Sequence, residues 1–122
     1  MEFITRKFVR ANTNKIFLFG DNLLGRGYGG QARAMRGEPN AVGIPTKKKP
    51  TDRPDAFFSD AEFEQNKAAI DRAFARLNGY SAGTEVVIPA AGLGTGLANL
   101  PDMAPRTLEY LEQKLAALYQ VI

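Results

Sequence analysis

The sequence predicts an α/β fold in which a mostly parallel sheet is flanked by helices, giving a compact three-layer arrangement. Residues 15–19 form a continuous apolar run rich in β-branched and aromatic side chains, which is typical of a strand buried on both faces, and a second apolar run lies at residues 85–89. A helical pattern separates the two runs, and a glycine-rich segment directly follows each of them. Strands that alternate with helices require right-handed crossovers, so the sheet is expected to be largely parallel.

Glycine and proline divide the first half of the chain into short elements. Residues 3–9 are expected to form a first strand, and residues 11–14 a turn before the strand at 15–19. The glycine-rich segment at residues 20–30 then leads into a short helix over residues 31–36.

Another strand is expected at residues 41–45, and prolines interrupt regular structure between residues 46 and 54. Ser59 and Glu62 have the spacing of a capping box, which predicts the start of a long helix. One face of this helix carries apolar side chains at helical spacing: Phe63, Ile70, Phe74 and Leu77.

Asn78-Gly79 predicts a left-handed stop for this helix. A strand is expected at residues 85–89 and a second glycine-rich loop at residues 90–97. The last helix is expected to begin near Pro105, because proline is tolerated in a first turn. Its apolar face consists of Leu108, Leu111, Leu115 and Leu118.

Composition indicates a single domain over residues 1–122, because 122 residues with 44% hydrophobic content suit one core. The chain has no cysteine and no histidine. Disulfides, thiolate metal sites and a Ser-His-Asp triad are therefore excluded, and no metal site or cofactor is expected. The net charge of +3 leaves anionic small molecules open as partners.

The chain contains no apolar stretch long enough to cross a membrane, and its first seven residues lack the apolar core of a signal peptide. We therefore expect no membrane partner and a cytoplasmic location.

The two glycine-rich segments are the main functional signal in the sequence. Both follow strands, and parallel α/β sheets bind ligands beyond the carboxyl ends of their strands. Glycine lets backbone amides approach a ligand, and successive amides at a helix start favour phosphate. Tight turning between strand and helix is the alternative explanation for either segment alone.

Known nucleotide motifs fit the first segment poorly. Residues 25–30 satisfy the G-x-G-x-x-G pattern of dinucleotide-binding domains. That pattern calls for an acidic residue about twenty positions later, where this chain has lysines 47–49. No Gly-Lys-Ser or Gly-Lys-Thr is present, which excludes a P-loop.

Both segments resemble the ligand loops of macrodomains, the α/β family that binds ADP-ribose and related NAD-derived ligands. Residues 19–32, Phe-Gly-Asp-Asn followed by a glycine series, are similar to the first ligand loop. Residues 88–101, with a Gly-Leu-Gly-Thr-Gly-Leu core, are similar to the loop that clamps the diphosphate. Ile44-Pro45-Thr46-Lys47 resembles a segment of small phage and bacterial macro-like proteins of uncharacterised function.

The resemblance implies a cleft for an ADP-ribose-type nucleotide between the two loops. The amides of the second loop would grip the diphosphate opposite Gly29 and Gly30, and Asn22 would face the distal ribose. The ligand-binding residues that it implies are Asp21, Asn22, Gly29, Gly30, Gln31, Leu93, Gly94, Thr95, Gly96 and Leu97.

The resemblance also makes ADP-ribosyl hydrolysis an alternative activity. One macrodomain branch uses a lysine and an aspartate, and Lys47 occupies a position similar to that lysine. The aspartate position is Ala98, and the nearest acid downstream is Asp102. Lys47 and Asp102 are therefore the candidate catalytic residues. The alternative for Lys47 is that it belongs to a solvated run of surface lysines without a catalytic role.

Several further side chains have two interpretations each. Asp21 can orient an adenine or a ribose, or can serve as an Asx-turn residue. Arg26 and Tyr28 can contact phosphate or a base, or can cover the loop from outside. Phe57 and Phe58 can stack on adenine, or can pack beside the helix start.

Four functions follow, of which the first and the third use the same pocket and cannot be separated by sequence. The first is binding of ADP-ribose or a related nucleotide, free or attached to a macromolecule. The second is hydrolysis of an ADP-ribosyl bond at the same cleft, and the third is phage-type sequestration of a nucleotide signal. Nucleic-acid binding through lysines 47–49 is the least favoured, because aromatic residues are not interleaved with the basic ones.

Overall fold

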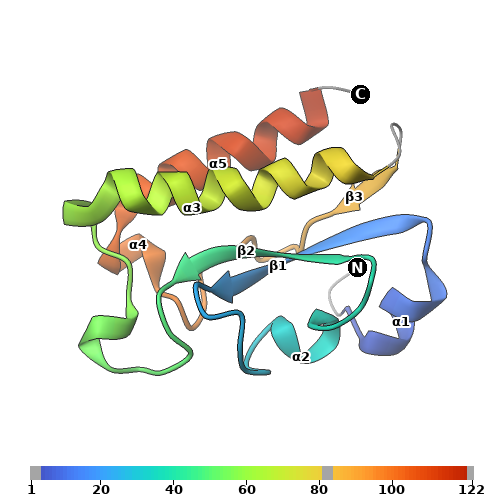
Figure 1. Ribbon diagram of the computed structural model, residues 1–122, viewed down its shortest axis with the longest axis horizontal. Coiled ribbons are helices and arrows are strands. Elements are labelled where there is room, and N and C mark those ends of the chain that lie inside the picture. Colours follow the sequence, from blue (N-terminus) through green and yellow to red (C-terminus); the bar gives the residue numbers. More distant parts are fainter. Residues whose placement is uncertain (1–3, 81–83, 121–122) are drawn as a thin grey trace.

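The computed structural model describes residues 4–80 and 84–120, which form a parallel sheet between two layers of helices (Figure 1). The sheet contains β1 (Lys15–Asn22), β2 (Ala41–Lys47) and β3 (Glu85–Val87) in the order β2-β1-β3, with both pairings parallel. The predicted α/β fold with a parallel sheet is thus confirmed.

Strand β1 lies at the centre of the sheet and is buried on both faces, as its continuous apolar run predicts. Ile16 and Leu18 belong to the core on one face, whereas Phe17 and Phe19 belong to the core on the other. Alternate residues of a strand point to opposite faces, so one strand contributes to two separate cores.

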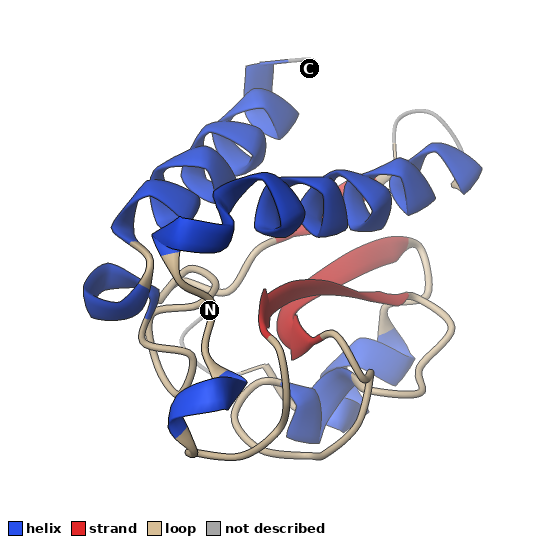
Figure 2. Ribbon diagram, turned by 60° about the vertical axis from the view of Figure 1, so that its left-hand side comes forward, coloured by secondary structure: helices blue, strands red, loops and turns tan. Residues whose placement is uncertain are grey.

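Helices α3 (Phe63–Ala75) and α5 (Pro105–Gln120) lie side by side over one face of the sheet (Figures 1 and 2). The last helix begins at Pro105, as predicted. The core under these two helices also contains residues from the segments that connect the main elements: Phe58, Leu93, Leu100 and Ala104.

Helices α1 (Arg6–Ala11) and α2 (Ala32–Met35) cover the opposite face. A smaller core there joins Val9 and Met35 to the sheet, and the ring of Phe8 meets that of Phe17 edge to face at 5.8 Å. Two short helices thus suffice to bury this side of β1.

The strand predicted at residues 3–9 is wrong, because residues 6–9 belong to helix α1 and residues 4 and 5 precede it; Phe3 lies outside the described residues. The Thr5 hydroxyl accepts a hydrogen bond from the Phe8 amide at 3.1 Å and caps the helix. Ile4, which precedes the capping residue, and Phe8 within the helix both pack against the smaller core.

The capping box predicted at Ser59 is also wrong. The Ser59 side chain forms no capping hydrogen bond, and a 3₁₀ turn, η2 (Asp60–Glu62), precedes α3. The Asp60 carboxylate instead accepts hydrogen bonds from the Arg106 and Thr107 amides, at 3.1 and 3.2 Å. Asp60 therefore caps α5 and not α3, the helix that follows it in sequence.

The left-handed stop predicted at Asn78-Gly79 is absent, since neither residue has a positive φ. Helix α3 instead ends in the 3₁₀ turn η3 (Arg76–Gly79). Two further short elements, η1 (Pro54–Ala56) and α4 (Leu100–Met103), lie in the connections that follow β2 and β3.

Candidate functional site

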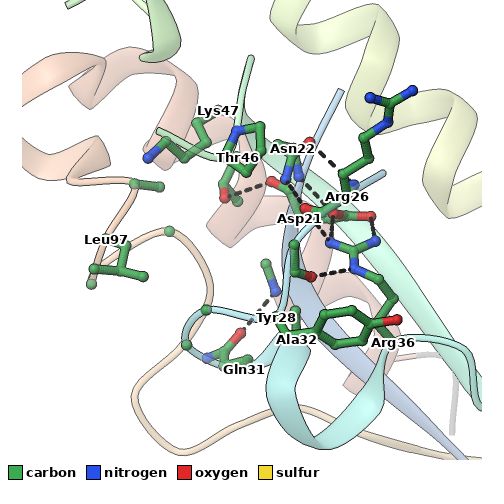
Figure 3. A pocket seen from close by; sticks show the side chains of 18 residues that line it. Asp21, Asn22, Arg26, Tyr28, Gln31, Ala32, Arg36, Thr46, Lys47 and Leu97 are labelled. Carbon is green, nitrogen blue, oxygen red and sulfur yellow. Dashed lines mark hydrogen bonds and ion pairs between the residues drawn. The ribbon is translucent and has the colours of Figure 1, made fainter. Parts of the chain in front are cut away.

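A cavity of about 260 Å³ lies beyond the ends of β1 and β2 (Figure 3). Residues of both glycine segments line it, and we call residues 25–30 the first loop and residues 92–97 the second loop. A Cβ atom built on Gly29 would lie 3.3 Å from the Leu97 Cδ1 atom, so the two loops are in close proximity. They meet at one edge of the sheet, as the sequence predicts.

Both strands extend further into the site than the sequence predicts. Asp21 and Asn22 belong to β1, and Thr46 and Lys47 belong to β2. The register shifts between Asp21 and Asn22, and the Leu23 amide then donates to the Lys47 carbonyl at 3.0 Å. Continued strand pairing therefore brings these four side chains to the same edge of the sheet.

The first loop is anchored by an ion pair between Asp21 and Arg36. Both carboxylate oxygens of Asp21 contact the Arg36 guanidinium, and both side chains are only 14% exposed. The same guanidinium donates to the carbonyls of Gly27 at 2.6 Å and Arg26 at 3.1 Å. Asp21 therefore positions the loop through Arg36, an arrangement that neither sequence interpretation of Asp21 included.

The Asn22 side chain shapes the turn into the first loop. Its Nδ2 donates to the Arg26 carbonyl at 2.7 Å, and its Oδ1 accepts from the Leu24 amide at 3.0 Å. The Asn22 residue borders the cavity, but its amide group is engaged inside the loop.

Gln31 connects the two loops. Its Oε1 accepts from the Gly20 amide at 2.8 Å, and its Nε2 donates to the Gly92 carbonyl at 2.9 Å. Gly92 lies 61 residues after Gln31 in the sequence. The two hydrogen bonds of Gln31 thus hold the second loop against the end of β1.

The second loop depends on close packing at Gly94, which has a φ of +81°. A Cβ atom there would overlap the Leu100 side chain and would lie 3.2 Å from the Thr46 Cγ2 atom. The Leu100 amide donates to the Gly94 carbonyl at 2.8 Å. The absence of a side chain thus lets the second loop fold tightly onto the floor of the cavity.

Both loops present backbone amides that have no acceptor within the described residues. They are the N–H groups of residues 27–32 in and after the first loop, and of residues 93–98 in the second. Most of these residues line the cavity. Successive unpaired amides on glycine-rich backbone are the arrangement that binds phosphate in other α/β proteins.

Lys47 borders the cavity at the end of β2. Its Nζ atom donates to the Thr51 carbonyl at 2.6 Å and lies 4.6 Å from the centre of the Phe57 ring. Burial lowers the pKa of Lys47, and the charge of Asp52 opposes part of that change. Lys47 is thus a more readily neutralised amine than an ordinary surface lysine.

The other two lysines of the run have acidic partners. Lys48 pairs with Glu62 at 2.5 Å, and Lys49 pairs with Asp55 at 2.8 Å. These contacts fold the segment after β2 back on itself, and they give the lysine run a structural explanation without nucleic acid.

Three residues expected at the site do not line the cavity. Leu93 is buried in the core, and the Thr95 side chain turns back to the Ala91 carbonyl at 2.8 Å. Asp102 lies exposed on α4. The structure therefore offers no support for a catalytic role of Asp102.

The remaining candidates divide between the cavity and the core. Figure 3 shows Arg26 and Tyr28 extending to different sides of the first loop, and Tyr28 is 63% exposed. Phe58 is a core residue, as its second interpretation has it, and Phe57 lies beneath Lys47.

Sequence reasoning missed Arg36 as a residue of this site. A single arginine in a short helix carries no signal of its own, because its role depends on Asp21 and on two loop carbonyls. The buried Thr46, whose Oγ1 donates to the Asp21 carbonyl at 3.2 Å, was recognised only as part of a motif.

The described residues contain neither a metal-binding cluster nor a membrane-spanning helix. No group of three or more acidic side chains there is arranged to hold a metal ion. No helix in the same part of the chain has the length and apolar character needed to span a membrane.

The chain belongs to a protein family of unknown function, DUF7831, whose family model matches residues 1–114. A search of curated proteins found no match, and a search of solved structures found none.

Proposed function

We propose that this protein binds an ADP-ribose-type nucleotide in the cavity between the two glycine loops. The observation that carries the proposal is the pair of acceptor-free amide runs, residues 27–32 and 93–98, that meet at one cavity. A diphosphate offers oxygen acceptors over a length that two opposed loops can bind together. The resemblance of both loops to macrodomain ligand loops supports the same ligand class.

The charge of the cavity supports an anionic ligand. Its lining includes the cationic residues Arg26, Arg36 and Lys47, against the single carboxylate of Asp21. The positive charge of Arg36 is already paired with the carboxylate of Asp21. Arg26 and Lys47 therefore leave the cavity with a positive potential that favours phosphate.

The size of the cavity limits how much of the nucleotide it encloses. Its volume of about 260 Å³ lies just below the range of roughly 300–1,000 Å³ for small-molecule sites. The diphosphate and one ribose are the parts that need the amides, so we assign them to the cavity. The base would then lie at its rim.

Calorimetry with ADP-ribose tests the proposal through a matched pair of glycine variants. Gly96 lines the cavity and Gly79 does not, yet neither has a positive φ and neither has a neighbouring atom within 4 Å of a built Cβ. Gly96→Glu places a negative charge beside the second loop, so ADP-ribose affinity should fall at least about tenfold by like-charge repulsion. Gly79→Glu should bind like the original protein.

Two results would overturn the proposal. One is the absence of both heat and thermal stabilisation at millimolar ADP-ribose, because a ligand of the folded state must stabilise it by mass action. The other is an equal loss of affinity in the Gly96 and Gly79 variants, which would indicate diffuse electrostatic attraction.

Hydrolysis of an ADP-ribosyl bond is a second candidate, favoured by Lys47 alone. The cavity holds this amine at its border, and burial lowers its pKa. An uncharged amine can attack the anomeric carbon and displace the carboxylate oxygen of the modified protein, after which water releases ADP-ribose and frees the lysine. Release of ADP-ribose from an ADP-ribosylated protein should then occur, and Lys47→Arg should abolish it while retaining binding.

Sequestration of a cytoplasmic nucleotide signal would use the same cavity without turnover. Recovery of an intact cyclic ADP-ribose isomer after incubation and heat denaturation would favour it over hydrolysis. Conversion of that isomer to ADP-ribose by the original protein but not by Lys47→Arg would favour hydrolysis.

A further inference from the structure

A second cavity, of about 270 Å³, lies on the other side of the turn that follows β1. Its walls come from this turn, from β2 and from the face of α3 that packs on β2. Asp21 and Asn22 border both cavities. The two spaces are therefore neighbours but have different linings.

Two arginines, Arg72 and Arg76, border this second cavity. They are four residues apart on a continuous helical segment, so they lie on the same face. Neither forms an ion pair with an acidic side chain of the described residues, and Arg76 donates only to the Gly43 carbonyl, at 3.2 Å. Two like charges at this spacing disfavour the helix slightly unless an anion lies between them.

Acids near this cavity are already committed to other partners. Asp21 has both carboxylate oxygens on Arg36. Asp71, which precedes Arg72 in the chain, contacts Tyr110 and Lys114. The potential in the second cavity is therefore positive. A helix dipole also favours arginine near a C-terminus, but it does not account for a cavity that both arginines border.

Apolar side chains complete the other wall. Leu23 and Leu24 border the cavity and are 51% and 54% exposed, which is high for leucine. A phosphate suits the arginines, because guanidinium groups bind phosphate oxygens in pairs. An organic group attached to that phosphate suits the leucines.

We propose that this second cavity binds an organic phosphate monoester, with its phosphate on Arg72 and Arg76 and its organic part against Leu23 and Leu24. This site is independent of the nucleotide proposed for the first cavity. It uses different side chains, and its occupant carries a terminal phosphate rather than a bridging diphosphate.

Titration of the isotope-labelled protein with AMP, followed by amide NMR shifts, tests this site. Saturable shifts are expected at Leu23, Leu24, Gly25 and Gly43. Inorganic phosphate should shift the same amides more weakly, and adenosine should leave them unchanged. The titration distinguishes the two cavities, because binding in the first would shift the amide signals of residues 27–32 and 93–98.

Charge-neutralising variants provide the control. Arg72→Gln and Arg76→Gln should each weaken the AMP-induced shifts at Leu23 and Gly43 about tenfold in affinity, since each removes charged hydrogen bonds to phosphate. Arg33→Gln removes the same charge from an exposed arginine that borders neither cavity. It should leave the titration unchanged.

Three results would overturn the second site: no shift at these amides at millimolar AMP, persistence of the shifts in the Arg72→Gln/Arg76→Gln protein, or an equal loss in Arg33→Gln. Such a result would not affect the proposal for the first cavity, because ADP-ribose binding there is measured by the amide signals of residues 27–32 and 93–98.

Discussion

The two glycine loops reach the same cavity by different physical means. Side chains hold the first loop, because Arg36 and Asn22 bind its carbonyls and amides. The second loop is held mainly by its own backbone turns and by the packing of Gly94 on Leu100. An ion pair thus shapes one half of the cavity, whereas the absence of a side chain shapes the other.

Gly94→Ala should give the largest effect, because it attacks the second loop at its tightest contact. The added methyl would overlap Leu100 and would sit on a residue with φ of +81°. Overpacking and left-handed strain together should lower the free energy of unfolding by about 3 kcal/mol. Urea denaturation measures this loss, and Gly96→Ala in the same loop should be nearly neutral because its Cβ meets open space.

Arg36→Met tests the corresponding anchor of the first loop. It leaves Asp21 mostly buried without its partner and removes donors from two loop carbonyls. Loss of a largely buried pair should cost about 2 kcal/mol of unfolding free energy. In the double variant Asp21→Asn/Arg36→Met part of that loss should return; strictly additive effects would show that the two side chains act separately.

Gln31→Met tests whether the loops depend on each other. The change keeps the side-chain length but removes two hydrogen bonds, to the Gly20 amide and the Gly92 carbonyl. A stability loss of about 1–2 kcal/mol is expected, together with weaker ADP-ribose binding. Calorimetry on the folded variant would show unchanged affinity if Gln31 served stability alone.

Glu38→Gln is the remote comparison and should have the smallest effect on the site. Hydrogen bonds from Arg6, and then from Arg10, hold the pKa of Glu38 below its usual value. The carboxylate therefore adds stability above its ordinary pKa, and this contribution is lost as the pH falls through the lowered value. Denaturation of both proteins should show a gap at pH 7 that closes as the pH falls through the lowered pKa of Glu38, and ADP-ribose affinity at pH 7 should not change.

Sequence pattern alone predicts most of the fold. The central strand is visible as a continuous apolar run at residues 15–19, and the last helix is marked by Pro105 and its leucines. Helix α1 is not recognisable from the sequence, because the four apolar side chains of residues 3–9 do not distinguish the period of a helix from that of a strand. Packing of Phe8 on Phe17 decides between them, and that contact is tertiary.

The candidate site could be predicted only in outline. Glycine spacing located both loops, since a loop after a parallel strand must lie at the carboxyl edge of the sheet. The positioning contacts of Arg36 and Gln31 were hidden, because each joins groups that come together only in the folded chain. Asp102 looked suitable by sequence distance alone, and the fold places it outside the cavity lining.

Amide NMR during titration with ADP-ribose tests the central claim most directly. If the two loops bind one diphosphate, the N–H signals of residues 27–32 and 93–98 must shift together, with a single saturation curve. Shifts confined to one loop, or to neither, would contradict the account even if the nucleotide bound elsewhere on the protein.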